Sequence, residues 1–230
     1  VYDKVVQKCG LLDEAGVQYA VQATINKQLL KDYRQGDGIK FVEALDKINW
    51  ENMAIVPVET DIPDLEISDA DLPALDAFTR EVTNCFIDRV YEGKESKIAS
   101  GIIAPILQLA KNKHVRTCTS GHSVFCDTDG SIYPCQMFCN EEEYKLGDID
   151  NGWSKKRSEK LSNITREDDE SCKNCISRNI CFMWCKGIQL LSKGDMYKVC
   201  EPRCVFQRAN TEECIKLLAK LNIGKIDSDR

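Results

Sequence analysis

The sequence has 230 residues, enough for one large domain or two small ones. Its net charge of −6 and isoelectric point near 5.2 exclude the basic face that nucleic-acid binding needs. No apolar run approaches the roughly 18 residues of a membrane span, and the charged N-terminal stretch is not a signal peptide. Eleven of the thirteen cysteines lie after residue 117, which indicates a metalloprotein of the reducing cytoplasm rather than a secreted disulfide framework.

Residues 1–66 alternate helical and strand patterns. The first helix has an apolar face and ends at Gly16, as is typical of a glycine C-cap. Val17–Ile25 alternates like a strand, and a second helical stretch is interrupted at Gly36. Met53–Val58 is a second apolar strand. This order predicts an α/β fold with a parallel sheet, and because two strands are too few for a complete sheet, we expect part of a larger α/β barrel.

Residues 67–113 are predicted to be a helical linker. An acidic stretch that contains Pro63 precedes two helices over about 71–92 and 95–112, which are separated near Gly93. The apolar stripe of the second helix is most simply explained by core packing.

The chain changes character at Cys118. Two short alternating runs, Ser123–Asp127 and Ser131–Pro134, flank a turn that contains Gly130, and this pattern predicts a β-hairpin. The hairpin brings Cys118, before it, near Cys135, at its end. A last helix over about 204–222 follows from apolar residues at helical spacing.

The spacing of the cysteines after residue 117 is the most informative feature of the sequence. It reads Cys118-x11-Gly130-x4-Cys135, then Cys172-x2-Cys175-x5-Cys181-x3-Cys185, then Cys200. Thiolates bind soft metals, and iron–sulfur clusters are held by sets of four thiolates. Seven or eight such ligands in one segment are enough for two clusters.

This pattern resembles the seven-cysteine signature of SPASM domains, the C-terminal extensions of radical S-adenosylmethionine (SAM) enzymes that modify peptides and proteins. Ser131–Cys135 and Tyr144–Ile149 resemble segments of the same family. The signature covers residues 118–200 and is specific, whereas residues 1–66 are similar to the last strands and helices of a radical SAM partial barrel by order and position alone. The resemblance implies that residues 114–230 are a mostly irregular SPASM domain, with a β-hairpin and helices that bind two [4Fe–4S] clusters.

The resemblance also assigns the ligands of these clusters. The first auxiliary cluster receives three thiolates, from Cys118, Cys135 and Cys185. The second receives four, from Cys172, Cys175, Cys181 and Cys200. The two sets interleave because the tight run of four cysteines cannot wrap one cubane fully, and similar cross-ligation occurs in two-cluster ferredoxins.

Two ligand positions stay open. The fourth ligand of the first cluster could be Cys126 or Cys139, or the position could be left to substrate or water. Cys126 lies within the first hairpin strand, where a buried core cysteine is the alternative. Cys204 follows Cys200 by one helical turn and could compete as the last ligand, but the family pattern Tyr197-x2-Cys200 favours Cys200.

Radical SAM catalysis requires a CxxxCxxC motif whose cluster chelates SAM, and the sequence contains no such triplet. We therefore expect the chain to be the C-terminal part of a longer enzyme and to be inactive in isolation. The missing portion would supply SAM, a third [4Fe–4S] cluster and the 5′-deoxyadenosyl radical, with a flavodoxin- or ferredoxin-like protein as the electron donor.

The resemblance implies a peptide or protein substrate, from which the radical abstracts hydrogen while the auxiliary clusters accept an electron or bind a substrate thiol. A thioether crosslink in a ribosomally made peptide, formylglycine in a sulfatase-type protein and a carbon–carbon crosslink are the expected products. The sequence does not choose among them.

The alternative is a zinc-bound structural or interaction module. Zn²⁺ also takes four thiolates, and Cys172-x2-Cys175 is a common half-site. However, the second pair is CxxxC only five residues later, whereas zinc modules usually pair two CxxC units. His114 and His122, the two histidines, lack a catalytic arrangement around them and are expected at the surface or beside the metal ligands.

Overall fold

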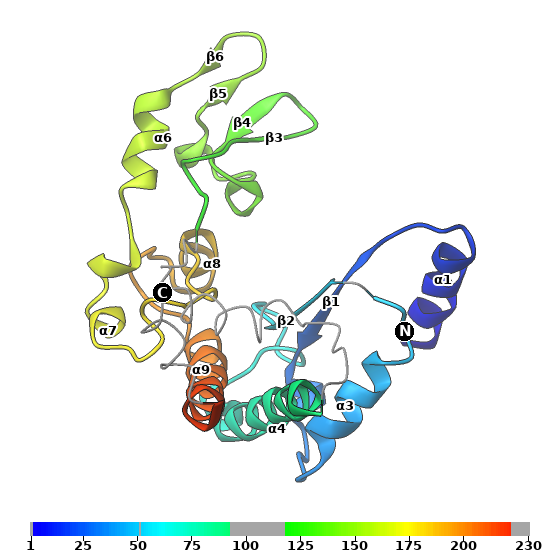
Figure 1. Cartoon of the computed structure of the whole chain (residues 1–230). Helices are drawn as coiled ribbons and strands as arrows, with labels where there is room; N and C mark the ends of the chain where they lie inside the picture. Colours follow the sequence, from blue (N-terminus) through cyan, green and yellow to red (C-terminus); the bar gives the residue numbers. More distant parts are fainter. Residues whose placement is uncertain (1, 51, 93–117, 222–230) are drawn as a thin grey trace, which may run out of the picture. The chain divides into compact units, whose positions relative to one another are not determined.

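The computed structural model describes residues 2–50, 52–92 and 118–221 (Figure 1). They fall into two compact units, of which the first combines Val1–Val115 with Glu201–Arg230 and the second is Arg116–Cys200. Both contain helices and a small sheet, so that the fold is mixed α/β. Within the described ranges, no helix has the length and apolar character needed to cross a bilayer.

The first unit begins with alternating helices and strands. Its elements are α1 (Tyr2–Glu14), β1 (Ala20–Ile25), α2 (Lys27–Leu30), α3 (Asp37–Leu45), β2 (Asn52–Pro57), the 3-10 turn η1 (Asp69–Asp71), α4 (Leu72–Tyr91) and α9 (Glu201–Leu221). Strands β1 and β2 pair in parallel, from Ala20 opposite Asn52 to Ile25 opposite Pro57, which confirms the predicted parallel pair. The first strand starts three residues later than predicted, because Gly16 has a φ of 66° and the chain is still leaving α1.

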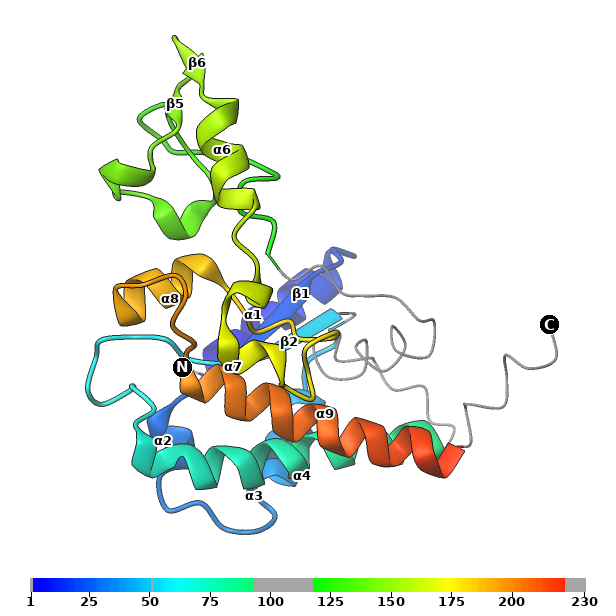
Figure 2. The same cartoon turned by 90° about the vertical axis from the view of Figure 1, so that its left-hand side faces the viewer.

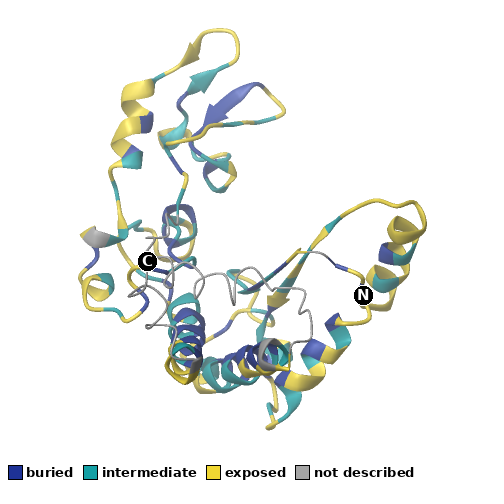
Figure 3. Cartoon of the chain, viewed as in Figure 1, coloured by how far each residue is buried: buried dark blue, intermediate teal, exposed yellow. Residues whose placement is uncertain are grey.

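Helix α4 contributes one continuous apolar face to the core of this unit. Its buried side chains Leu75, Phe78, Val82 and Phe86 recur at helical spacing. Helix α9 runs beside it (Figure 2), and the facing sides of the two helices are buried (Figure 3). Arg80 joins the pair with ion pairs of 2.8 Å to Asp76, 2.7 Å to Glu212 and 2.8 Å to Glu213.

The position of the last helix differs from the expected one. From the sequence, α9 was assigned to the cysteine-rich domain, but its buried residues, among them Phe206 and Leu217, pack with α4 in the first unit. The two helices are joined by this apolar packing and by ion pairs from Arg80 to glutamates 132 and 133 residues away, which no local sequence pattern reveals. The helix predicted over 95–112 and His114 lie outside the described residues.

The second unit is built from short elements. They are β3 (Phe125–Cys126), β4 (Ser131–Tyr133), η2 (Gln136–Phe138), η3 (Glu142–Tyr144), β5 (Gly147–Asp148), β6 (Gly152–Trp153), α6 (Lys155–Ser162), η4 (Arg166–Asp168), α7 (Glu170–Lys173) and α8 (Lys186–Lys193). The four strands form an antiparallel sheet in chain order. The predicted β3–β4 hairpin is confirmed, and Gly130 at its turn has a φ of 85°.

We expect Phe78→Ala to destabilise the first unit strongly. The Phe78 ring is fully buried against Phe41, with ring centroids 5.3 Å apart, and against Tyr33. Its loss leaves a cavity that costs about 3–5 kcal/mol of unfolding free energy. Urea denaturation followed by circular dichroism measures this loss. Ile39→Ala, an exposed substitution on α3, is the control and should change the free energy by less than about 1 kcal/mol; an equal loss in both variants would contradict the packing described.

Candidate metal centre

All thirteen cysteines lie within the described residues, and none forms a disulfide. The seven cysteines of the predicted signature are buried or half-buried, all of them in the second unit. Thiols with this degree of burial and without a disulfide are suited to metal binding. Two separate groups of three are recognisable among them.

The first group consists of Cys118, Cys135 and Cys185. Cys135 immediately precedes η2, and Cys185 is the N-cap residue of α8. Burial raises the pKa of the Cys135 thiol, and the charges of Cys185 and Cys118 raise it further. The backbone N–H of Met137 acts in the opposite direction by hydrogen bonding to the Cys135 thiolate.

A close approach of two backbones brings this group together. Gly187, in the first turn of α8, faces η2 so tightly that a Cβ atom there would lie 2.4 Å from the Cβ of Met137. Only glycine fits at this position. The contact joins the segment of Cys185 to that of Cys135, although the two cysteines are 50 residues apart in the sequence.

The second group consists of Cys172, Cys175 and Cys181. Asp169 caps α7 through the Ser171 N–H, and the Cys175 N–H donates to the Cys172 carbonyl at 3.2 Å, so that the CxxC segment forms a tight turn. Burial raises the pKa of Cys172 to about 12, and the charges of Asp169, Cys181 and Cys175 contribute in the same direction.

Cys181 occupies a site with hydrogen-bond donors for its sulfur. Burial raises its pKa, whereas the backbone N–H groups of Met183 and Trp184 and the charge of Arg166 lower it. Arg166 is held there by a 3.1 Å hydrogen bond from its guanidinium to the Cys181 carbonyl. Donors of this kind stabilise a thiolate, which is the form that binds metal.

Cys200 is buried, and its sulfur lies 3.2 Å from the hydroxyl of Ser192 on α8. Cys204, its competitor as the last ligand, is half-buried in α9 of the first unit. The assignment of the last ligand to Cys200 therefore stays a prediction.

Of the two alternatives for Cys126, the buried core cysteine is excluded. Cys126 is exposed, and the two-residue strand β3 to which it belongs lies on the edge of the sheet. Cys139 is half-buried at the end of η2, and its pKa is raised by burial and by the charges of Asp127 and Asp129. Neither observation connects these thiols with the first group.

Sequence reasoning missed Lys186. This side chain is only 1% exposed, and its ammonium donates to the Ser120 carbonyl at 3.3 Å and to the Leu161 carbonyl. Burial lowers its pKa, while the charges of Cys118, Cys135 and Cys185 raise it, so that it lies beside the first group. Nothing in the pattern of α8 distinguishes it from an ordinary surface lysine.

Among the described residues, no three or more His, Cys, Asp or Glu side chains are drawn together closely enough to hold one metal ion. The donors of the predicted signature are all thiols, which is the ligand chemistry of an iron–sulfur cluster. The indole N–H of Trp184, next to Cys185, is buried without a hydrogen-bond partner, as is expected beside a group that accepts hydrogen bonds.

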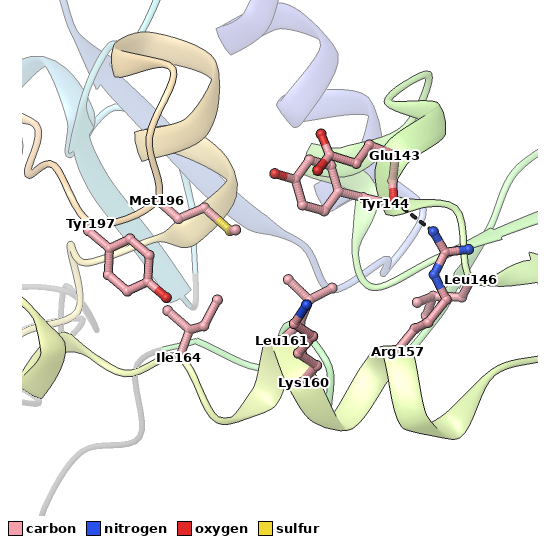
Figure 4. A pocket seen from close by; sticks show the side chains of 9 residues that line it. All are labelled: Glu143, Tyr144, Leu146, Arg157, Lys160, Leu161, Ile164, Met196 and Tyr197. Atoms are coloured by element: carbon pink, nitrogen blue, oxygen red, sulfur yellow. Dashed lines mark hydrogen bonds between the residues drawn. The ribbon is translucent and has the colours of Figure 1, made fainter.

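The same unit contains a pocket of about 410 Å³ (Figure 4). Its lining residues are Glu143, Tyr144, Leu146, Arg157, Lys160, Leu161, Ile164, Met196 and Tyr197. The Arg157 guanidinium fixes one wall by donating to the Glu143 carbonyl at 2.9 Å. Helix α6 contributes Arg157, Lys160 and Leu161 to one wall of the pocket. The backbone carbonyl of Leu161 also accepts a hydrogen bond from the Lys186 ammonium.

Comparison with solved structures identifies the fold. Histidine-tagged anSMEcpe with bound AdoMet, which is SAM, superposes with a TM-score of 0.69 over 99% of this chain and 60% of that chain, at 14% identity. This protein is an anaerobic sulfatase-maturating enzyme of the radical SAM–SPASM class. The chain has the fold of part of a radical SAM–SPASM enzyme.

A second solved structure has the same fold. Native anSMEcpe with bound AdoMet and the Kp18Cys peptide superposes with a TM-score of 0.64 over 97% of this chain and 61% of that chain, at 14% identity. An uncharacterized protein of Archaeoglobus fulgidus is 25% identical over 141 residues, which are 60% of this chain and 34% of the relative. No family model matches the sequence. The chain thus spans only part of the proteins that it resembles.

We expect Gly187→Ala to destabilise the second unit. The added Cβ would overlap the Cβ of Met137, and overpacking of this kind costs about 1–3 kcal/mol. Thermal unfolding of the metal-free protein measures the effect as a lower melting temperature. Gly10→Ala is the matched control, since no atom lies within 4 Å of a Cβ at that helical position. Unchanged melting of Gly187→Ala would refute the close approach of α8 and η2.

Proposed function

We propose that the chain is the C-terminal part of a radical SAM–SPASM maturase, which modifies a ribosomally made peptide or a protein and holds two auxiliary [4Fe–4S] clusters. One observation carries the proposal. The seven cysteines of the signature all lie in the second unit, where they are buried or half-buried and form no disulfide. The radical SAM–SPASM fold supports it independently.

The residues would hold the clusters as follows. The first cluster would be bound by Cys118, Cys135 and Cys185. The second would be bound by Cys172, Cys175, Cys181 and Cys200. The chain's own contribution is to desolvate the sulfurs and to direct the N–H groups of Met137, Met183 and Trp184 at them. When bound, such clusters supply electron transfer, or a coordination position for a substrate thiol where an iron is open.

A peptide or protein partner is supported by the structures of anSMEcpe with bound Kp18Cys and Cp18Cys peptides. The remaining partners of the proposal are SAM with its cluster-binding motif, supplied by the part of the enzyme that this chain lacks, and a flavodoxin- or ferredoxin-like reductant in the cytoplasm. The sulfatase-maturating activity of anSMEcpe favours formylglycine formation as an alternative to a thioether crosslink. The two products differ in whether the first cluster needs an open iron.

Anaerobic reconstitution should load about eight irons per chain, since two cubanes contain four irons each. Cys181→Ala should lose about half of this iron and melt at a lower temperature, because cluster binding contributes to the folding free energy. Cys85→Ser, on α4 of the first unit, should retain all of it. Iron analysis and calorimetry measure both effects. Saturation at about four irons, or a colourless protein that retains zinc, would contradict the proposal.

The chain alone should form no 5′-deoxyadenosine from SAM and dithionite, even with both auxiliary clusters loaded. The reason is that no CxxxCxxC motif is present to leave an iron open for the methionine moiety of SAM. Chromatography of the reaction detects the product, and a radical SAM enzyme with its motif intact is the positive control. Turnover by the chain alone would mean that an auxiliary cluster takes over the SAM site.

Serine substitutions at Cys126 and Cys139 should both leave the first cluster in place. Cys126 is exposed, and the pKa of Cys139 is shifted by burial and aspartates rather than by the cysteines of the first group. An iron without a protein thiolate should then change its visible spectrum when a small thiol is added. Loss of the first cluster in either variant would instead identify that cysteine as the fourth ligand.

A further inference from the structure

Lys186 is buried in a place that does not favour a cation. It is the first residue of α8, where the N–H groups and the helix dipole present positive charge. Burying an ammonium is costly unless anions and hydrogen-bond acceptors compensate it. The position of Lys186 is therefore explained by what surrounds it and not by helix stability.

Its surroundings provide acceptors and potential anions. The ammonium donates to the carbonyl of Ser120, two residues after Cys118, and to the carbonyl of Leu161 at the end of α6. The charged or titratable groups that act on it are the thiols of Cys118, Cys135 and Cys185, with a contribution from Asp168. Among the described residues, it forms no ion pair with a carboxylate, so that the three cysteines would become its main counter-charges once metal binding converts them to thiolates.

We propose that Lys186 is a positioning residue of the first auxiliary cluster, whose buried ammonium offsets the negative charge of the cluster and its thiolates and thereby raises its reduction potential. This inference rests on the proposed function. The reduced cluster has one more negative charge than the oxidised cluster, so that a nearby cation stabilises the reduced form. The net charge and hydrogen bonding around a cluster are established determinants of its potential.

The test compares Lys186→Met with Lys193→Met in the full chain after anaerobic reconstitution. Lys193 lies at the other end of α8 and is exposed, which makes it a matched control. Redox titration with dithionite as the electron donor, monitored by electron paramagnetic resonance, gives the potential of each cluster. In Lys186→Met we expect one of the two reduction potentials to fall by at least about 59 mV, which corresponds to a tenfold decrease in the equilibrium constant for reduction. The other potential and both potentials of Lys193→Met should stay unchanged.

A third variant separates charge from hydrogen bonding. Lys186→Gln keeps a donor but removes the charge, and its potential should fall as in Lys186→Met. A potential in Lys186→Gln equal to that of the unchanged protein would overturn the proposal, as would unchanged potentials in Lys186→Met or equal shifts in the Lys193→Met control.

Iron content distinguishes the remaining outcomes. If Lys186→Met loses the first cluster while its metal-free form melts like the parent, the counter-charge is needed to hold the cluster, which supports the proposal. If the metal-free form of the variant also melts at a lower temperature than the parent, Lys186 stabilises the fold through its hydrogen bonds to Ser120 and Leu161, and the proposal fails. If the unchanged chain binds no iron, the proposed function itself fails.

Discussion

The candidate centre depends on the close packing of α8 against η2. Gly187 allows this approach, because any side chain there would overlap Met137. Cys185 is the N-cap residue of α8, two residues before this contact, and Cys135 immediately precedes η2. Cys172 and Cys175 belong to α7 and the turn that follows it. In the proposed function, this contact would hold Cys185 on the side of the first cluster.

In the metal-free protein, burial makes the thiols of both groups difficult to deprotonate. The raised pKa values of Cys135, Cys172 and Cys181 mean that these thiols hold their protons at neutral pH when no metal is bound. Metal binding must displace these protons, so that loading weakens as the pH falls and couples to folding. The N–H donors at Cys135 and Cys181 reduce the cost of forming the thiolates.

Features that depend on local pattern could be predicted from the sequence. The sequence pattern predicted the parallel strands, the β3–β4 hairpin and the start of α4. The division of the cysteines into two ligand groups stays a prediction. Features that depend on contacts between residues far apart in the sequence could not be predicted. The attachment of α9 to α4 rests on Arg80 and its glutamates, strands β5 and β6 are only two residues long, and Lys186 is identified only by its burial. None of these leaves a periodic signal.

The central claim is that two groups of thiols hold two iron–sulfur clusters. Anomalous diffraction at the iron absorption edge, from crystals of the anaerobically reconstituted chain, tests it most directly because it locates iron without reference to activity. The account predicts two separate iron peaks. One should lie among Cys118, Cys135 and Cys185, and the other among Cys172, Cys175, Cys181 and Cys200. A single iron peak, or anomalous signal at the zinc edge alone, would contradict it.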